Sequence, residues 1–277
     1  MCCDSPVTDD LYAQLRDVAE LLATDAADFV RRRRGDLFVR TKSGPTDPVT
    51  IADTETEQFV RDRLAALRPG EPILGEENGG SEADPGAVRW VVDPIDGTVN
   101  FVYGIPAYAV SVAAQIDGVS VAGAVADVCS GEVYSAALHG GAHVSSGPEH
   151  RVLTCSNATE LPMTLLGTGF GYDPQRRAAQ AALVAQMIPV VRDIRRIGSA
   201  ALDLCAVAAG RLDAHYEHGL NVWDWAAGAL IAAEAGAAVV LPDQDVSGAA
   251  ILVAAAPGVA RQLLAALERC SGLDPLP

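Results

Sequence analysis

The stretch Trp90-Val91-Val92-Asp93-Pro94-Ile95-Asp96-Gly97-Thr98 decides how this 277-residue chain is interpreted. Its apolar first half predicts a strand, which ends in two carboxylates, Asp93 and Asp96, three positions apart. Two carboxylates at the end of a buried strand cannot ionise side by side unless positive charge lies between them. The following Gly97 and Thr98 offer backbone N–H groups and a hydroxyl, which suit a phosphate. The stretch therefore predicts a metal ion held beside a phosphate ester.

Three further acidic positions lie next to predicted strands or helix starts. Glu76, followed by Glu77, ends a short apolar strand. Asp53 falls in the first turn of a helix that opens at Thr50, and Asp224 precedes an Ala-rich helix. In sheets flanked by helices, ligands bind outside the carboxyl ends of the strands, and oxygen ligands suit Mg²⁺ or Mn²⁺ rather than zinc. Taken singly, the two aspartates could instead cap helices and the glutamate pair could be a solvated turn.

Apolar periodicity predicts an α/β protein with a mixed α+β organisation. Helices are predicted at 11–34, 50–69, 175–187, 200–209, 226–235 and 259–269, and strands at 73–77, 90–93, 108–116, 119–128, 133–137, 165–168, 213–217, 239–241 and 251–255. We expect a single domain over 11–272. Its N-terminal half, 11–150, carries the acid-ended strands and an antiparallel meander, and its C-terminal half is 151–272. No Pro- or Ser-rich linker separates the halves, so we expect them to pack as one unit.

Composition narrows the class of protein. Apolar residues make up 49% and charged residues 20% of the chain, and no apolar run reaches the length of a membrane span. The first residues are acidic rather than basic, and the six cysteines form no C-x-x-C pair. These features predict a cytoplasmic protein with reduced, mostly buried thiols. The net charge of −16 argues against nucleic acid or an anionic membrane as a main partner.

Several motifs of the chain resemble the signatures of the inositol monophosphatase family. They are Gly75-Glu76-Glu77, Asp93-Pro94-Ile95-Asp96-Gly97-Thr98 with Asn100-Phe101, and Trp223-Asp224-x-Ala226-Ala227-Gly228, and the second and third together are highly specific. Lys42-Ser43 with Asp47, Val49-Thr50 and Asp53, then Arg196-x-Gly198-Ser199-Ala200-Ala201 and Glu217-x-Gly219, resemble further landmarks of the family. All occur in family order between about residues 11 and 272. The whole is similar to the bacterial SuhB-type branch of that family.

The resemblance implies a layered α-β-α-β-α sandwich. It also implies Mg²⁺-dependent hydrolysis of inositol 1-phosphate to myo-inositol and phosphate by metal-activated water, without a covalent intermediate. Two to three Mg²⁺ ions per site are expected, with Mn²⁺ as a substitute and Li⁺ as an inhibitor, in a cytoplasmic homodimer. The same scaffold leaves open fructose 1,6-bisphosphate, 3′-phosphoadenosine 5′-phosphate or histidinol phosphate as substrate. A non-catalytic regulatory interaction protein is the alternative from a different class.

The resemblance also implies a role for each matching residue. Glu76, Asp93 and the Ile95 carbonyl would hold the first metal, and Asp93, Asp96 and Asp224 the second, while Asp53 would contact a third ion through water. Glu76 and Thr98 would orient the attacking water. The substrate-binding residues expected are Glu76, Ile95, Asp96, the N–H groups of Gly97 and Thr98, Gly198, Ser199, Ala200, Glu217 and Asp224. Expected catalytic residues are Glu76, Thr98 and Asp53.

Two features of the chain qualify this expectation. Asn221 stands where animal enzymes often have His near the leaving group, which puts substrate preference in doubt but not the reaction class. Five carboxylates, those of Glu76, Glu77, Asp93, Asp96 and Asp224, outnumber the four positive charges of two divalent ions, so Lys42 or a third ion is needed to admit a phosphate dianion. Val99, where many members have Thr, lies outside the expected metal ligands.

Overall fold

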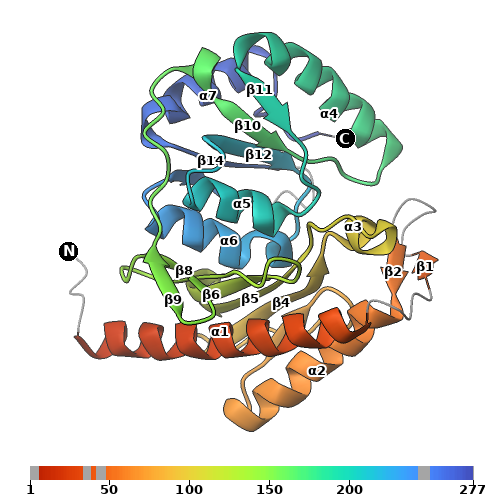
Figure 1. The fold of residues 1–277 in the computed structure, drawn as a ribbon, viewed down its shortest axis with the longest axis vertical. Coiled ribbons are helices and arrows are strands. Elements are labelled where there is room, and N and C mark those ends of the chain that lie inside the picture. The colour runs from red at the N-terminus through yellow and green to blue at the C-terminus, as the bar shows by residue number, and fades with distance from the viewer. Residues whose placement is uncertain (1–5, 34–38, 42–47, 243–249, 277) are drawn as a thin grey trace.

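Two β-sheets alternate with three layers of helices (Figure 1). The computed structural model describes residues 6–33, 39–41, 48–242 and 250–276. Helices α1 and α2 cover one face of the first sheet, α5 and α6 lie between the two sheets, and α4 and α7 cover the far face of the second sheet (Figure 1). The predicted α-β-α-β-α sandwich is therefore confirmed.

The first sheet has seven strands in the order β3-β4-β5-β6-β7-β8-β9, parallel between β3 and β4 and antiparallel elsewhere. Its elements are β3 (Ile73–Gly75), β4 (Val88–Asp96), β5 (Ala109–Ile116), β6 (Val119–Asp127), β7 (Val133–Ala137), β8 (Ala142–Ser146) and β9 (Glu149–Val152). The outer helices are α1 (Pro6–Arg33) and α2 (Ile51–Leu67), joined by a hairpin of β1 (Val39–Thr41) and β2 (Pro48–Thr50). Leu15, Ala19, Leu22 and Ala26 form the buried stripe of α1 against this sheet.

The second sheet has the order β11-β10-β12-β14-β13. Its strands are β10 (Leu165–Thr168), β11 (Asp193–Arg195), β12 (Ala214–His218), β13 (Ala238–Val240) and β14 (Ile251–Ala255). The remaining helices are α3 (Thr98–Tyr103), α4 (Pro174–Met187), α5 (Ala200–Ala208), α6 (Val222–Glu234) and α7 (Pro257–Arg269), with 3-10 turns η1 (Leu161–Met163) and η2 (Ile188–Val190). No helix in the described parts of the chain is both long and apolar enough to cross a bilayer.

Small residues let the middle layer approach its neighbours. A Cβ on Gly123 of β6 would lie 3.0 Å from the Cα of Ala227 on α6, and a Cβ on Gly228 would lie 2.9 Å from the Cβ of Leu204 on α5. The two helices therefore pack against each other and against the first sheet with little space between backbones. This packing brings the N-terminus of α6 to the end of β4, where the acidic stretch lies (Figure 1).

The structure differs from the sequence-based expectation at several boundaries. Strands β8, β9 and β11 were not predicted, and the first sheet continues to Val152 rather than ending at Ala137. Helix α6 begins at Val222, four residues before the predicted start, so Asp224 lies inside its first turn. Among the four cysteines in described regions, all free, Cys155 and Cys205 are buried but Cys129 is exposed.

Candidate active site

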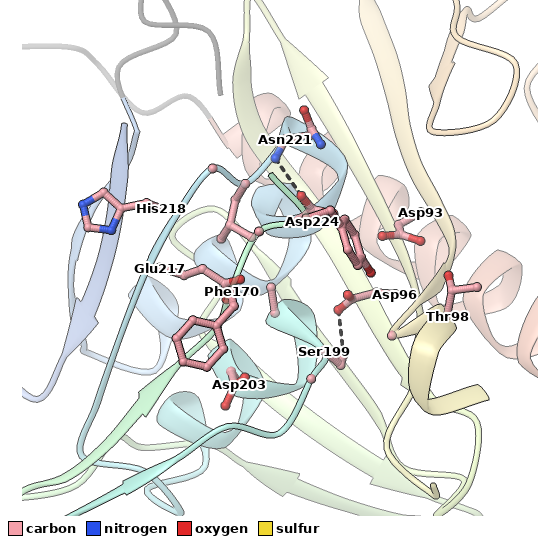
Figure 2. Close-up of a pocket in the computed structure, with 18 of the residues that line it drawn as sticks. Asp93, Asp96, Thr98, Phe170, Ser199, Asp203, Glu217, His218, Asn221 and Asp224 are labelled. Carbon is pink, nitrogen blue, oxygen red and sulfur yellow. Dashed lines mark hydrogen bonds between the residues drawn. The ribbon is translucent and has the colours of Figure 1, made fainter. Parts of the chain in front are cut away.

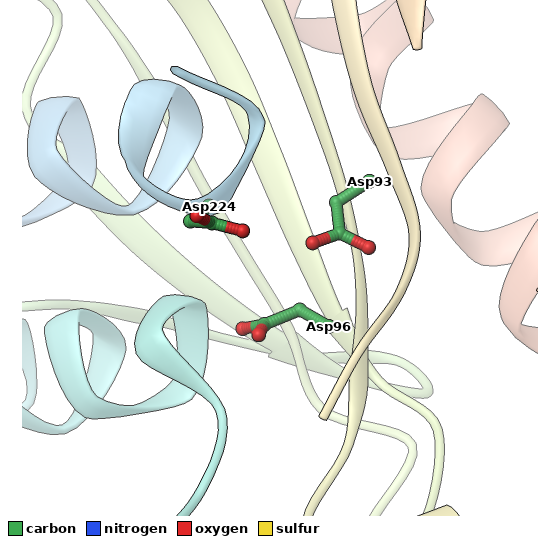
Figure 3. Close-up of side chains that lie close together, drawn as sticks. All are labelled: Asp93, Asp96 and Asp224. Atoms are coloured by element: carbon green, nitrogen blue, oxygen red, sulfur yellow. The ribbon is translucent and has the colours of Figure 1, made fainter. Parts of the chain in front are cut away.

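Three aspartates from two elements converge where β4 ends. Asp93 and Asp96 lie on either side of a register shift at the end of β4, and Asp224 comes from the first turn of α6. One carboxylate oxygen from each lies within 4.8 Å of the others, and Figure 3 shows the three groups pointing at a common centre. Asp93 and Asp96 are buried and Asp224 is partly buried. Asp224 lies 131 positions after Asp93 in the sequence (224 − 93). The packing of α6 brings the two together.

Each aspartate is oriented by a backbone N–H that donates to one of its oxygens. The Ile95 N–H donates to Asp93 Oδ1 at 3.0 Å, and the Asn221 N–H donates to Asp224 Oδ2 at 2.6 Å. Asp96 Oδ2 accepts from the Ala201 N–H at 2.7 Å and from the hydroxyl of Ser199 at 2.6 Å. Ser199, predicted on the substrate side, thus also ties α5 to the acidic cluster. These bonds hold the carboxylates in place before any ligand arrives.

Removal from water and mutual repulsion raise the pKa of all three carboxyls. Burial is the largest cause for each, and the pKa of Asp93 is raised further by Glu76, Asp96 and Asp224. The pKa of Asp96 is raised to about 6, although its bonds from Ser199 and Ala201 oppose the increase. None of the three forms an ion pair with a cationic side chain within the described ranges. Buried, preoriented carboxylates without such a partner fit a hard divalent cation such as Mg²⁺ or Mn²⁺.

Asp53 serves both as a helix cap and as a neighbour of the site. Its Oδ2 accepts from the Thr50 N–H at 2.7 Å, which closes the start of α2, while its Oδ1 accepts from the hydroxyl of Thr98 at 3.1 Å. Burial is the main cause that raises the pKa of Asp53. From the sequence, Asp53 could be either a helix cap or a site residue. In the structure its two oxygens face different partners, Thr50 and Thr98, so one carboxylate can serve both roles.

A pocket of about 380 Å³ opens above the acidic cluster (Figure 2). Every predicted site residue except Asp53 lines it: Glu76, Asp93, Ile95, Asp96, Gly97, Thr98, Gly198, Ser199, Ala200, Glu217 and Asp224. The structure also brings in residues that the sequence did not single out, chiefly the 169–173 turn after β10, Arg176, Asp203 and His218. The sequence signal that could have identified these residues is the end of the predicted strand at Thr168, since ligands bind beyond the carboxyl ends of strands. Lys42 lies outside the described residues.

A glycine at position 97 lets the halves of the site meet. Gly97 has φ 98°, and a Cβ there would lie 3.0 Å from the Ala107 carbonyl and 3.1 Å from the Gly198 carbonyl. The positive φ and the close carbonyls both favour glycine. Asn100 fixes the same approach, because its Nδ2 donates to the carbonyls of Ala107 at 2.7 Å and Ile197 at 2.9 Å.

Glu57, one turn beyond Asp53 on α2, holds the turn that carries Glu76. Its carboxylate is buried and accepts from the backbone N–H groups of Glu77 at 2.7 Å and Asn78 at 3.2 Å. Arg61 pairs with it at 2.7 Å. Gly75 leaves room for this group, since a Cβ at that position would lie 2.3 Å from the Glu57 carboxyl carbon. Helix α2 therefore positions both Thr98 and the Glu76 turn.

Glu57→Gln should raise the dissociation constant of the site for Mg²⁺ by about tenfold or more, the effect expected when the support of a metal ligand is lost. An amide cannot accept from both N–H groups and still pair with Arg61. Calorimetric titration of the purified protein with Mg²⁺ measures this. Glu55→Gln on the same helix, where Glu55 pairs with Arg33 at the surface, is the matched control. Equal Mg²⁺ curves for the two variants would contradict the assigned role.

Comparison with known proteins agrees with this geometry. A model described as the inositol monophosphatase family matches residues 11–272. The chain belongs to this family. It is therefore an enzyme of the phosphoric monoester hydrolase class. The family resemblance and its SuhB-type character, both expected from the sequence, are confirmed.

Individual relatives cover almost the whole chain. A protein of Mycobacterium leprae (strain TN) named inositol-1-monophosphatase is 64% identical, over 98% of this chain and 99% of that protein. A protein of Pasteurella multocida (strain Pm70) named Nus factor SuhB is 38% identical, over 86% of this chain and 88% of that one. The solved structure of Mycobacterium tuberculosis SuhB superposes with a TM-score of 0.84 at 61% identity, over 95% of this chain and 98% of that one.

Proposed function

We propose that this family member hydrolyses inositol 1-phosphate to myo-inositol and phosphate, with Mg²⁺ held by the aspartates of β4 and α6. The observation that carries the proposal is the convergence of Asp93, Asp96 and Asp224 within 4.8 Å beneath a pocket of about 380 Å³. When bound, divalent ions would offset the carboxylate charges, polarise the phosphoryl oxygens and lower the pKa of a water molecule. Glu76, Asp93 and the Ile95 carbonyl would hold one ion, Asp93, Asp96 and Asp224 a second, and Asp53 a third through water.

Thr98 is the residue best placed to orient the attacking water. Its hydroxyl lies 3.0 Å from the Ile95 carbonyl and 3.1 Å from Asp53 Oδ1, but its single proton can serve only one of them. If the Ile95 carbonyl is taken up by a bound ion, the hydroxyl proton of Thr98 would point to Asp53. The lone pairs of Thr98 could then accept a hydrogen bond from water. Glu76, which also lines the pocket, would accept from the same water. No side chain has to form a covalent bond, so positioning and charge stabilisation supply the rate.

The remaining pocket residues would bind the rest of the ester. The N–H groups of Gly97 and Thr98 would meet the phosphate, with Ile95 and Asp96 beside them. Glu217, Asp224 and the 198–200 segment would accept from and donate to the hydroxyls of the alcohol. Asn221 is exposed at the start of α6, where it can contact the leaving group without contacting the ions. We expect Mn²⁺ to replace Mg²⁺, Li⁺ to inhibit, and the enzyme to act as a cytoplasmic homodimer.

Phosphate release from four esters tests this proposal. Inositol 1-phosphate, fructose 1,6-bisphosphate, 3′-phosphoadenosine 5′-phosphate and histidinol phosphate would each be supplied with Mg²⁺, with chelator, and with Mg²⁺ plus Li⁺. We expect the inositol ester to be hydrolysed fastest, and turnover to be lost with chelator and reduced by Li⁺. If only another of the four esters is hydrolysed, the proposed substrate is wrong. If hydrolysis continues in chelator, the metal-based mechanism is wrong.

A non-catalytic regulatory role is the second candidate. The relative named Nus factor SuhB favours it, as does a net charge of −16 that would suit a basic partner. A deletion strain carrying an Asp93→Asn copy separates the two candidates. Restoration of every phenotype by this inactive copy would favour the regulatory role.

A further inference from the structure

A buried histidine lies behind the substrate-side acid Glu217. His215 is 0% exposed and sits two residues before Glu217 on β12, so both side chains face the same side of the strand. Their partners on β14, Ala254 and Leu252, belong to the core between the sheets, which places both side chains toward α5 and the pocket. The Nε2 atom of His215 lies 3.5 Å from Oε2 of Glu217.

Strand β10 is built to leave room for these two side chains. Gly167 pairs with His215 in the parallel register, and a Cβ on Gly167 would lie 2.9 Å from Nδ1 of His215. A Cβ on Gly169 would lie 2.1 to 2.2 Å from the carboxylate of Glu217. Gly167 on β10 and Gly169 just after its end thus face His215 and Glu217 on β12. A larger residue at either glycine would displace the side chain that it faces.

Asp203 completes the arrangement from α5. Its Oδ1 would lie 3.2 Å from a Cβ on Gly167, on the same side of β10 as Nδ1 of His215. Neither ring nitrogen of His215, nor Oδ1 of Asp203, has a hydrogen-bond partner among the described residues. Figure 2 shows Asp203 and Glu217 on the side of the pocket away from Asp93 and Thr98. The histidine therefore lies behind two carboxylates that line the pocket, those of Asp203 and Glu217.

The charges around the ring favour an N–H at both nitrogens. The negative charges that act on His215 are those of Asp203 from α5 and Glu217 from β12 and, as the smallest contribution, Asp96 from β4. Burial lowers the pKa of His215, but these three carboxylates outweigh it and raise the pKa overall. Catalytic hydrogen bonds are often long in ligand-free sites and shorten when substrate binds. The 3.5 Å separation is of this kind.

We propose that His215 is a positioning residue that donates from Nε2 to Glu217 and so fixes the carboxylate that recognises the alcohol of the substrate. Asp203 orients the ring from the Nδ1 side. The proposal rests on the proposed function, because it assigns Glu217 to a hydroxyl of the inositol ring. It predicts an effect on selectivity between alcohols, whereas the metal cluster governs hydrolysis of any phosphate ester.

Two variants of His215 separate positioning from simple packing. His215→Gln keeps an amide donor near the Nε2 position, which faces Glu217, whereas His215→Asn keeps one near the Nδ1 position, which faces Asp203. The readout is kcat/KM for inositol 1-phosphate divided by kcat/KM for 4-nitrophenyl phosphate, whose ring has no hydroxyl. We expect this ratio to fall about tenfold in His215→Asn and less than about threefold in His215→Gln, as for loss of one hydrogen bond to a charged group. Added to Glu217→Gln, the Asn variant should lower the ratio no further.

An equal fall in both variants, or no fall in either, would overturn the proposal. A second measurement needs no change at His215 and no turnover, so it remains informative if the variants unfold or the proposed substrate is wrong. In protein labelled with ¹⁵N-histidine, the Nε2 proton of His215 should be slow to exchange and should shift in Glu217→Gln. A ring without that proton, or a signal that Glu217→Gln leaves in place, would contradict the assignment.

Discussion

Asp93→Asn should lower turnover of inositol 1-phosphate by a factor on the order of 1,000 while leaving the fold intact. Asp93 is buried at the centre of the acidic cluster, and the proposed mechanism uses it for both of the tightly held ions. The amide oxygen can still accept from the Ile95 N–H, so the bond that orients the side chain is kept. The change removes one negative charge from a group whose pKa is raised by its neighbours, so the metal-free variant should also be more stable than the wild type.

Turnover and thermal unfolding of the same preparation measure both effects. Asp62→Asn is the matched control, because Asp62 is exposed on α2 and accepts only from the surface residue Gln58 in the described structure. It should change neither turnover nor the unfolding midpoint. An Asp93→Asn protein that keeps a tenth or more of the wild-type turnover would contradict the placement of the ions.

The metal-free protein should lose stability as the pH rises from 5 to 8, and saturating Mg²⁺ should cancel that loss. The pKa of folded Asp96 is about 6, against roughly 3.9 for an unfolded aspartate, and those of Asp93 and Asp224 are also raised. The folded protein therefore binds more protons in this interval. The stabilisation is complete below the unfolded pKa and is lost as the pH rises through the folded pKa values. Asp96 alone accounts for roughly 1 to 2 kcal/mol of the loss between pH 5 and 8.

Thermal unfolding between pH 5 and 8, with chelator and with Mg²⁺, measures this dependence. For a chain of this size, a loss of roughly 1 to 2 kcal/mol corresponds to a shift of a few degrees in the midpoint. Mg²⁺ at 100 times its dissociation constant should restore about 2.7 kcal/mol at pH 8. Asp224→Asn should flatten the pH dependence of the metal-free protein. A midpoint that rises with pH in chelator would show that the carboxylates are not held together as the structure indicates.

The acidic stretch at the end of β4 was predictable because its chemistry depends on neighbouring residues in the sequence. An apolar strand that stops at two carboxylates, followed by Gly-Thr, indicates a metal and a phosphate whatever surrounds it. The double roles of Asp53 and Asp224 were not predictable, because cap and site compete for the same residue in a sequence. Only the fold shows that the second oxygen of Asp53 faces Thr98, from a helix 45 positions away (98 − 53).

The missed elements share a different cause. Strand β8 is only five residues long and β9 is exposed throughout. Strand β8 forms because β7 offers an edge to pair with, and β9 forms on the edge of β8. The space that Gly167 and Gly169 leave for His215 and Glu217 could not be predicted from the sequence either, since it depends on how the two strands are aligned. Tertiary pairing, rather than local propensity, decides both features.

The most direct test of the central claim is to locate the ions. Crystals grown with Mn²⁺ and inositol 1-phosphate in an inhibited or slow state would give anomalous scattering peaks at each bound metal. The structure predicts peaks within bonding distance of Asp93, Asp96 and Asp224, at the common centre of the three carboxylates. Full occupancy of Mn²⁺ elsewhere, with none at this centre in protein that Mn²⁺ activates, would contradict the account.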